Sequence, residues 1–179
     1  IISISREHGT NGKEIGRIVA NRLNIPFYDK EEIKEFAIKN NMLAENYSDE
    51  EIYDNFLSLD VSREAIINQA KVIKKIANDG DAVIIGRSAD YILRENENLI
   101  RVFIYAPMDY KIKNIMKNYG DNEKQAKSHI LDSDKSRSNY YSAISNRTWG
   151  DKNNYDLCID AKIGNENVVK IICDYVKNR

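Results

Sequence analysis

The sequence has few residues that interrupt regular structure and few that crosslink a chain. Its 179 residues include 8 Gly and 2 Pro, so most of the chain is expected to lie in helices and strands. Its 2 Cys cannot form a tetrahedral zinc site alone and are interpreted as reduced thiols. The net charge of −1 argues against a dedicated nucleic-acid surface or a polybasic membrane surface. No apolar run is long enough to span a bilayer, and a soluble cytoplasmic protein is expected.

The chain instead alternates short apolar runs with longer amphipathic stretches. The run at 82–85, Ala-Val-Ile-Ile, is apolar throughout, which is typical of a parallel strand covered on both faces. The stretches between the runs have helical periodicity. This alternation predicts a single domain over residues 1–179, a three-layer α/β fold with one five-stranded parallel sheet between helices. The five expected strands lie at 1–5, 26–29, 82–85, 99–106 and 155–160.

A glycine-containing loop joins the first expected strand to the first expected helix, where a phosphate-binding P-loop would lie. Its amide groups and the helix N-terminus would bind an anion, and Lys13 is placed to reach the β- and γ-phosphates of a nucleotide. The match to Gly-x-x-x-x-Gly-Lys-Ser/Thr is incomplete, because Glu7 occupies the first glycine position and Glu14 the Ser/Thr position. A tight strand-to-helix turn without a ligand is the alternative. The candidate phosphate-binding residues are His8, Gly9, Thr10, Asn11, Gly12, Lys13 and Glu14.

Two further groups of charged residues are candidates for an anion site. Arg87 follows the apolar strand and Gly86, at the edge of the sheet where α/β proteins bind ligands. Its guanidinium could clamp a carboxylate or a phosphate, or simply lie at the surface. Asp134 and Arg137 are three residues apart and share one face of a polar helix, either as a solvated ion pair or as part of a site.

Four blocks of the sequence together resemble the cytidylate kinase-like family, a divergent branch of the P-loop nucleoside-monophosphate kinases. They are residues 4–16, 26–30, 83–93, and 134–137 with 149–157 downstream. The resemblance implies ATP as donor, Mg²⁺, and an acceptor nucleotide bound by Arg87, Asp134 and Arg137. It implies a helical acceptor-side insertion at about 30–80 and a helical lid at about 107–148. Asp29, which ends the second strand, becomes a candidate for organising Mg²⁺-bound water or the acceptor.

The chain departs from the family pattern on the acceptor side and in the lid. Lys30 and Glu31 follow Asp29 where Ser-Gly is usual, and Glu35 stands where an acceptor-binding arginine is usual. Residues 42–62 are acidic. An arginine-rich lid is missing, so the expected lid cations are Lys111, Lys113 and Arg147.

The predicted function is an ATP- and Mg²⁺-dependent phosphotransferase with CMP or dCMP as first-choice acceptor. Two alternatives stay open: a non-catalytic nucleotide-binding or regulatory module, and a kinase for a nucleoside or another small metabolite. Small-molecule nucleotides are the expected partners, nucleic acid and membranes are not, and a homodimer is left open. The expected catalytic residues are Lys13, Asp29, Arg87 and Arg137, with Mg²⁺ at Asp29 or Glu14.

Overall fold

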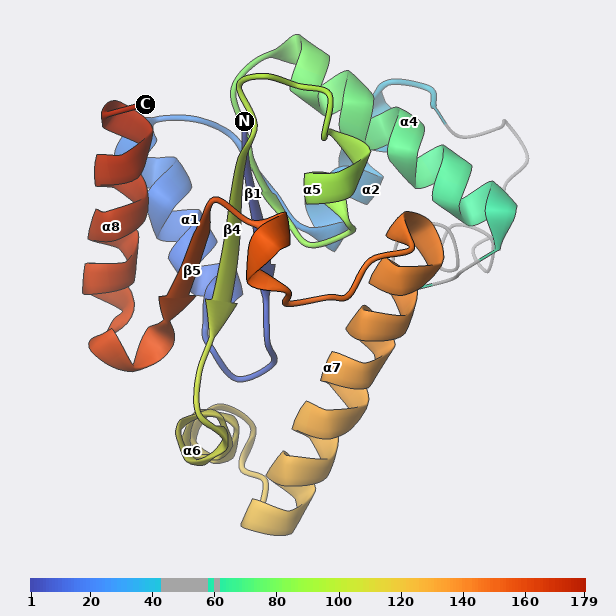
Figure 1. Cartoon of the computed structure of the whole chain (residues 1–179). Helices are drawn as coiled ribbons and strands as arrows, with labels where there is room; N and C mark the ends of the chain where they lie inside the picture. The colour runs from blue at the N-terminus through green and yellow to red at the C-terminus, as the bar shows by residue number, and fades with distance from the viewer. Residues whose placement is uncertain (43–57, 60–61) are drawn as a thin grey trace.

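Five short strands form one parallel sheet in the order β2-β3-β1-β4-β5 (Figure 1). The computed structural model describes residues 1–42, 58–59 and 62–179. The central strand β1 pairs with β3 on one side and β4 on the other, with Ile2 opposite Val83 and Ile100. The five-stranded parallel sheet predicted from the sequence is therefore confirmed. The strands are β1 (Ile2–Arg6), β2 (Phe27–Tyr28), β3 (Val83–Ile85), β4 (Ile100–Tyr105) and β5 (Leu157–Asp160).

Helices cover both faces of the sheet, which gives the predicted three layers (Figure 1). Helices α1 (Gly12–Leu23) and α8 (Asn165–Lys177) pack on one face, and α2 (Lys30–Lys39), α4 (Arg63–Asp79) and the short α5 (Ala89–Ile92) on the other. Strand β3 shows why both faces need a cover. Val83 and Ile85 belong to the apolar core beneath α1 and α8, while Ile84 belongs to the core beneath α2 and α4, because successive side chains of a strand point to opposite faces.

Two further helices lie beyond the carboxyl ends of the strands rather than on a face of the sheet (Figure 1). They are α6 (Met108–Tyr119) and α7 (Glu123–Ser145), and both lie within the range of about 107–148 that was expected to be helical. Ile115, Ala126 and Ile130 form a small apolar core between them. Short 3-10 turns at Lys152–Asn154 and Ala161–Ile163 flank β5.

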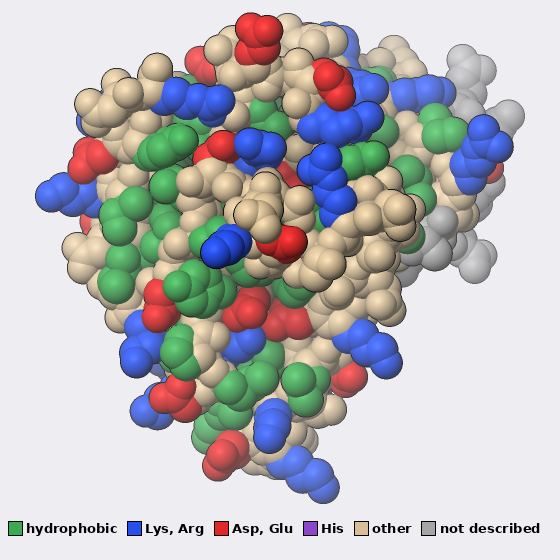
Figure 2. Space-filling model, in the orientation of Figure 1, with side chains coloured by type: hydrophobic (Ala, Val, Ile, Leu, Met, Phe, Trp, Pro, Cys, Tyr) green, Lys and Arg blue, Asp and Glu red, His purple; other side chains and the backbone are tan. Residues whose placement is uncertain are grey.

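Some expectations fall outside the described residues. The sequence at 52–59 has a weak helical pattern, and residues 42–62 are acidic. Both segments lie mostly in the part of the chain that the structure does not describe. Among the described helices, none combines the length and apolar character that a membrane crossing requires. Acidic and basic side chains are interspersed on the face shown in Figure 2, in keeping with the net charge of −1.

Candidate functional site

The segment between β1 and α1 forms a closed loop that ends at the N-terminus of a helix. Gly9 and Asn11 have φ of +86° and +58°, the left-handed conformation that turns successive amide groups inward. Gly9 also has no room for a side chain, since a Cβ there would lie 2.9 Å from the carbonyl oxygen of Lys111. The hydroxyl of the buried Thr10 donates to the carbonyl of Glu7 at 2.8 Å. This is the backbone geometry of an anion-binding loop.

Glu7, which departs from the P-loop pattern, tethers the loop from outside. Its Oε2 accepts hydrogen bonds from the amide of Ala106 at 3.1 Å and from Lys111 Nζ at 2.9 Å. Lys111 Nζ also lies 3.4 Å from Asp134 Oδ2, and its side chain is only 7% exposed. A lysine buried between two carboxylates links the loop to α6 and α7, so the role of a lid cation predicted for Lys111 does not fit this geometry.

The other two predicted lid cations are exposed. Lys113 lies on α6 with its side chain in solvent. Arg147 lies over the ring of Tyr91, with Cζ 5.4 Å from the ring centroid. Neither lines the cavity described below.

Asp134 binds the loop rather than facing open space. Its Oδ1 accepts the backbone N–H of His8 at 2.7 Å and Nη1 of Arg137 at 3.1 Å. The resemblance implied that Asp134 contacts the acceptor. In this structure the carboxylate instead takes one of the amide donors of the loop and fixes Arg137 beside it.

The end of β1, the first turn of α1, the carboxyl edge of the sheet and α7 line a cavity of about 430 Å³. Of the predicted phosphate-binding residues only Lys13 lines it; the loop residues 8–12 lie beside it. Lys13, Asp29, Arg87 and Arg137, the four predicted catalytic residues, all line it. The structure therefore brings together residues that are far apart in the sequence. The other charged residues that line the cavity are Arg6, Lys30, Glu31 and Asp132.

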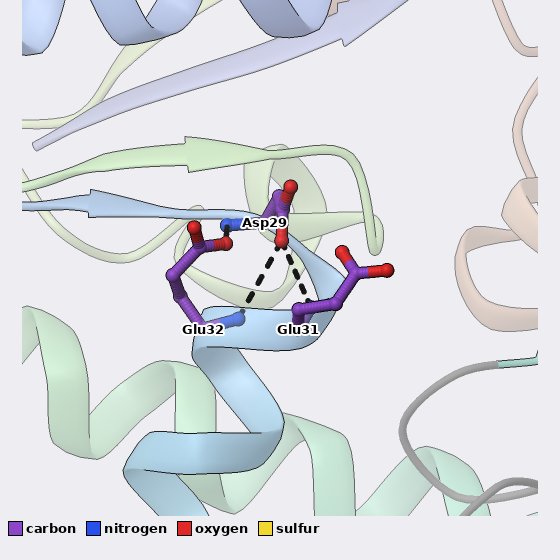
Figure 3. A group of neighbouring side chains, drawn as sticks. All are labelled: Asp29, Glu31 and Glu32. Carbon is purple, nitrogen blue, oxygen red and sulfur yellow. Dashed lines mark hydrogen bonds between the residues drawn. The ribbon is translucent and has the colours of Figure 1, made fainter.

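Asp29 caps the N-terminus of α2 (Figure 3). It also lines the cavity. Its Oδ1 accepts the amides of Glu31 at 2.8 Å and of Glu32 at 3.5 Å. Glu32 Oε2 accepts the amide of Asp29 at 3.1 Å, and the two reciprocal bonds between Asp29 and Glu32 form a capping box. Asp29 Oδ2 forms an ion pair with Lys13. Burial acts to raise the pKa of Asp29, but hydrogen bonds from Glu32, Lys13 and Glu31 hold it well below its usual range. Asp29 is therefore ionised at neutral pH.

Asp29 is also the better of the two predicted metal ligands. Carboxylate oxygens of Asp29, Glu31 and Glu32 lie within 4.8 Å of one another (Figure 3). Glu32 Oε2 already accepts a hydrogen bond from the Asp29 amide, and Glu32 does not line the cavity. The oxygens that could bind a metal ion at the cavity are therefore Asp29 Oδ2 and those of Glu31. One or two carboxylates are the usual protein ligands of Mg²⁺ in phosphate-transfer sites, so this donor set fits the ion. The other candidate, Glu14, is exposed and lies 3.5 Å from Asn165 Nδ2 of α8, outside the cavity.

Arg87 is presented to the cavity by an unusual turn. Gly86, Arg87 and Ser88 have φ of +69°, +57° and +52°, three successive left-handed residues. Each non-glycine residue in this region costs about 1 kcal/mol, and such strain is concentrated at functional sites. Arg87 is 8% exposed and its guanidinium donates to the carbonyl of Ser58. Burial lowers its pKa.

Sequence reasoning missed two features of the site. One is Arg6, which lines the cavity from the end of β1. Its place at the carboxyl edge of the sheet is the same signal that singled out Arg87. The other is a group of buried polar side chains near the cavity: Asp90, Tyr141 and Tyr155 are 3%, 2% and 8% exposed. Asp90 Oδ1 has no hydrogen-bond partner among the described residues, and burial raises the pKa of Asp90 to about 6.

Replacing Asp90 with asparagine is expected to stabilise the protein at pH 7 by about 2 kcal/mol. A folded-state pKa above the unfolded value means that the stabilising contribution is present at low pH and is lost as the pH rises to about 6. The measurement is the free energy of unfolding from pH 4 to pH 7, which should fall less in the variant than in the wild type. Asp174→Asn, on the exposed side of α8, should leave the profile unchanged. A variant that is less stable at pH 7 would show that the cluster needs the charged carboxylate.

Comparison with known proteins places the fold and the family. A solved structure of an uncharacterized protein from Eubacterium ventriosum ATCC 27560 is 32% identical, with a TM-score of 0.82 over 99% of this chain and 98% of that one. A shikimate kinase from Bacteroides thetaiotaomicron (13% identity, TM-score 0.60, 98% of this chain and 97% of that one) shares the fold. A gluconokinase from Sinorhizobium meliloti 1021 also shares the fold (11% identity, TM-score 0.57, 99% of this chain and 91% of that one). No curated protein sequence matches. The model of the cytidylate kinase-like family matches residues 1–163, so the chain belongs to that family, and family and fold together support a phosphotransferase.

Proposed function

We propose that the protein is an ATP- and Mg²⁺-dependent phosphotransferase whose acceptor is a small anionic molecule, with CMP or dCMP as first choice. One observation carries the proposal. A single cavity is lined by the lysine that follows the glycine-containing loop, by an ionised carboxylate paired with that lysine, and by arginines from the end of β3 and from α7. Cations around a small cavity suit phosphoryl transfer, because its catalysis is mostly positioning and charge neutralisation.

Each group has a role that follows from its place. The loop amides and Lys13 would hold the β- and γ-phosphates of the donor, with Lys13 exchanging its contact with Asp29 for the phosphates. Arg87 and Arg137 would orient the acceptor. Asp29 and Glu31 would hold Mg²⁺, which when bound neutralises charge on the donor phosphates. Helices α6 and α7 would serve as the lid that excludes water.

The position of Glu7 favours catalysis over a non-catalytic module. A carboxylate inside the loop would repel a phosphate, but the Glu7 side chain is turned outward to Ala106 and Lys111. The departure from the P-loop pattern is therefore compatible with anion binding. Glu14 lies outside the cavity as well, so it does not obstruct the donor site.

A second acceptor class is favoured by a different observation. Asp29 and Glu31 line the cavity beside Lys13, and their charge would oppose an incoming phosphate unless Mg²⁺ lies between them. A hydroxyl group could instead donate a hydrogen bond to the ionised Asp29. A kinase for a nucleoside or another small hydroxylated metabolite is therefore the second candidate.

The test is ADP release from ATP–Mg²⁺ with a panel of acceptors: CMP, dCMP, UMP, cytidine and a small hydroxy acid. We expect CMP or dCMP to raise ADP release well above the acceptor-free rate. Turnover with an unphosphorylated alcohol alone would decide for the second candidate. Thermal stabilisation by ATP–Mg²⁺ without turnover on any acceptor would refute the kinase and favour a non-catalytic nucleotide-binding module.

A further inference from the structure

Arg6 reaches the cavity through a slot lined by two glycines. It is the last residue of β1, the central strand, at the carboxyl edge of the sheet. A Cβ at Gly12, the first residue of α1, would lie 2.6 Å from Arg6 Cγ. A Cβ at Gly86 would collide with Arg6 Nη1. In a chain with 8 glycines, two that are distant in sequence therefore leave room for one arginine side chain.

The position of this slot is informative about the reaction. Gly12 closes the loop that would hold the donor phosphates, and Gly86 precedes Arg87 on the side that would hold the acceptor. The guanidinium that passes both glycines therefore lies between the loop that would hold the donor and the turn that would hold the acceptor.

Arg6 also differs from Lys13 and Arg137 in forming no ion pair among the described residues. Lys13 is paired with Asp29, and Arg137 with Asp134. The Arg6 guanidinium makes no hydrogen bond or ion pair with residues 1–42, 58–59 or 62–179. Burial, followed by the charges of Arg137 and Arg87, lowers its pKa, and the charges of Asp29 and Asp134 only partly offset this. An anion at this point of the cavity would complete that compensation.

We propose that Arg6 is a further catalytic residue, which binds the phosphoryl group at the junction of the donor and acceptor halves of the cavity. This inference rests on the proposed function. In the transfer, the bond between the γ-phosphorus and the β–γ bridging oxygen breaks and its electron pair stays on ADP. An acceptor oxygen forms the new P–O bond, and any proton on it passes to solvent. Arg6 keeps its protons and donates hydrogen bonds to the peripheral oxygens of the phosphoryl group, where charge is spread in the transition state.

The first test compares Arg6→Gln and Arg6→Lys with the wild type in two measurements. One is the rate of ADP release with the best acceptor, and the other is thermal stabilisation by inorganic phosphate. We expect kcat to fall about 100-fold in both variants with KM for ATP within a few-fold, since a point charge does not replace a planar donor pair. Arg6→Gln should also lose the stabilisation by phosphate. Without phosphate it should be at least as stable as the wild type, because it removes an unpaired charge.

A second variant displaces Arg6 without changing it. Gly86→Ala puts a methyl group against the guanidinium, and Gly120→Ala is the matched control, because their φ values are +69° and +75° and a Cβ at Gly120 meets nothing within 4 Å. Both variants carry a similar backbone penalty. Only Gly86→Ala should lose phosphate binding and turnover.

The outcomes separate this proposal from the proposed function. If the wild type turns over and Arg6→Gln matches it in kcat and in phosphate stabilisation, the role of Arg6 is refuted while the function stands. A variant that raises only KM for the acceptor would also refute it. If the wild type transfers to no acceptor, the proposed function fails, and phosphate stabilisation then decides whether Arg6 binds the anion. A wild type that phosphate does not stabilise would overturn the inference.

Discussion

Replacing Lys13 with alanine is expected to lower the rate of phosphoryl transfer about 1,000-fold and to leave the fold intact. Lys13 lies in the first turn of α1 with its side chain 54% exposed, so little packing is lost on truncation. Lys13 directly follows Gly12 at the end of the loop, where the donor phosphates would lie, and Lys113 and Arg147 are outside the cavity and do not replace it. The measurement is ADP release at saturating ATP–Mg²⁺ with the best acceptor.

The control for this variant is Lys170→Ala, an exposed lysine on α8 that should leave turnover unchanged. Loss of Lys13 also removes a partner of Asp29, whose lowered pKa stabilises the fold above the unfolded pKa and less as the pH falls. Because Lys13 is half exposed, the stability lost at neutral pH should be about 1 kcal/mol or less. Wild-type turnover in Lys13→Ala would show that the loop lysine is not a donor ligand.

Replacing Lys111 with methionine is expected to destabilise the protein by about 3 kcal/mol, because it leaves two largely buried carboxylates without their shared cation. Methionine keeps much of the length and apolar volume of the side chain, so the loss reports the charge. Glu7 Oε2 and Asp134 Oδ2 lie 2.9 Å and 3.4 Å from Lys111 Nζ. For a chain of this size the melting temperature should fall by about 8 °C. Since Glu7 and Asp134 both bind the loop, stabilisation by ATP–Mg²⁺ should weaken as well.

Lys113→Met on the same helix is the matched control for this prediction. Lys113 is exposed, and its replacement should change stability by no more than about 0.5 kcal/mol. Equal losses of stability in the two variants would contradict the claim that Lys111 stabilises the fold through Glu7 and Asp134. A Lys111→Met protein with wild-type stability and lower kcat would restore the lid-cation role that the sequence suggested.

The fold could be predicted because its signals are local in the sequence. The apolar run at Val83–Ile85 and the helical spacing of Ile15 and Val19 each follow from the period of the element and the need to bury one face or both. The short helix Ala89–Ile92 was not predicted, since four residues are too few to show a period. The candidate site was partly predictable for the same reason, because parallel strands that end together place Asp29 and Arg87 on one edge of the sheet.

The sequence by itself therefore determined the parallel sheet, the glycine-containing loop between β1 and α1 and the edge at which charged residues meet. Only the tertiary structure decided which charges are paired and which face the cavity. The Glu7–Lys111 and His8–Asp134 contacts join residues 104 and 126 positions apart, and no local period reveals such a pair. Lys111 and Lys113 have the same charge, so composition treats them alike. They are two positions apart on α6 and therefore point to nearly opposite faces, and only Lys111 is buried. Arg6 is distinguished by two glycines from separate segments that make room for it, a relation that exists only once β1, α1 and β3 are packed together.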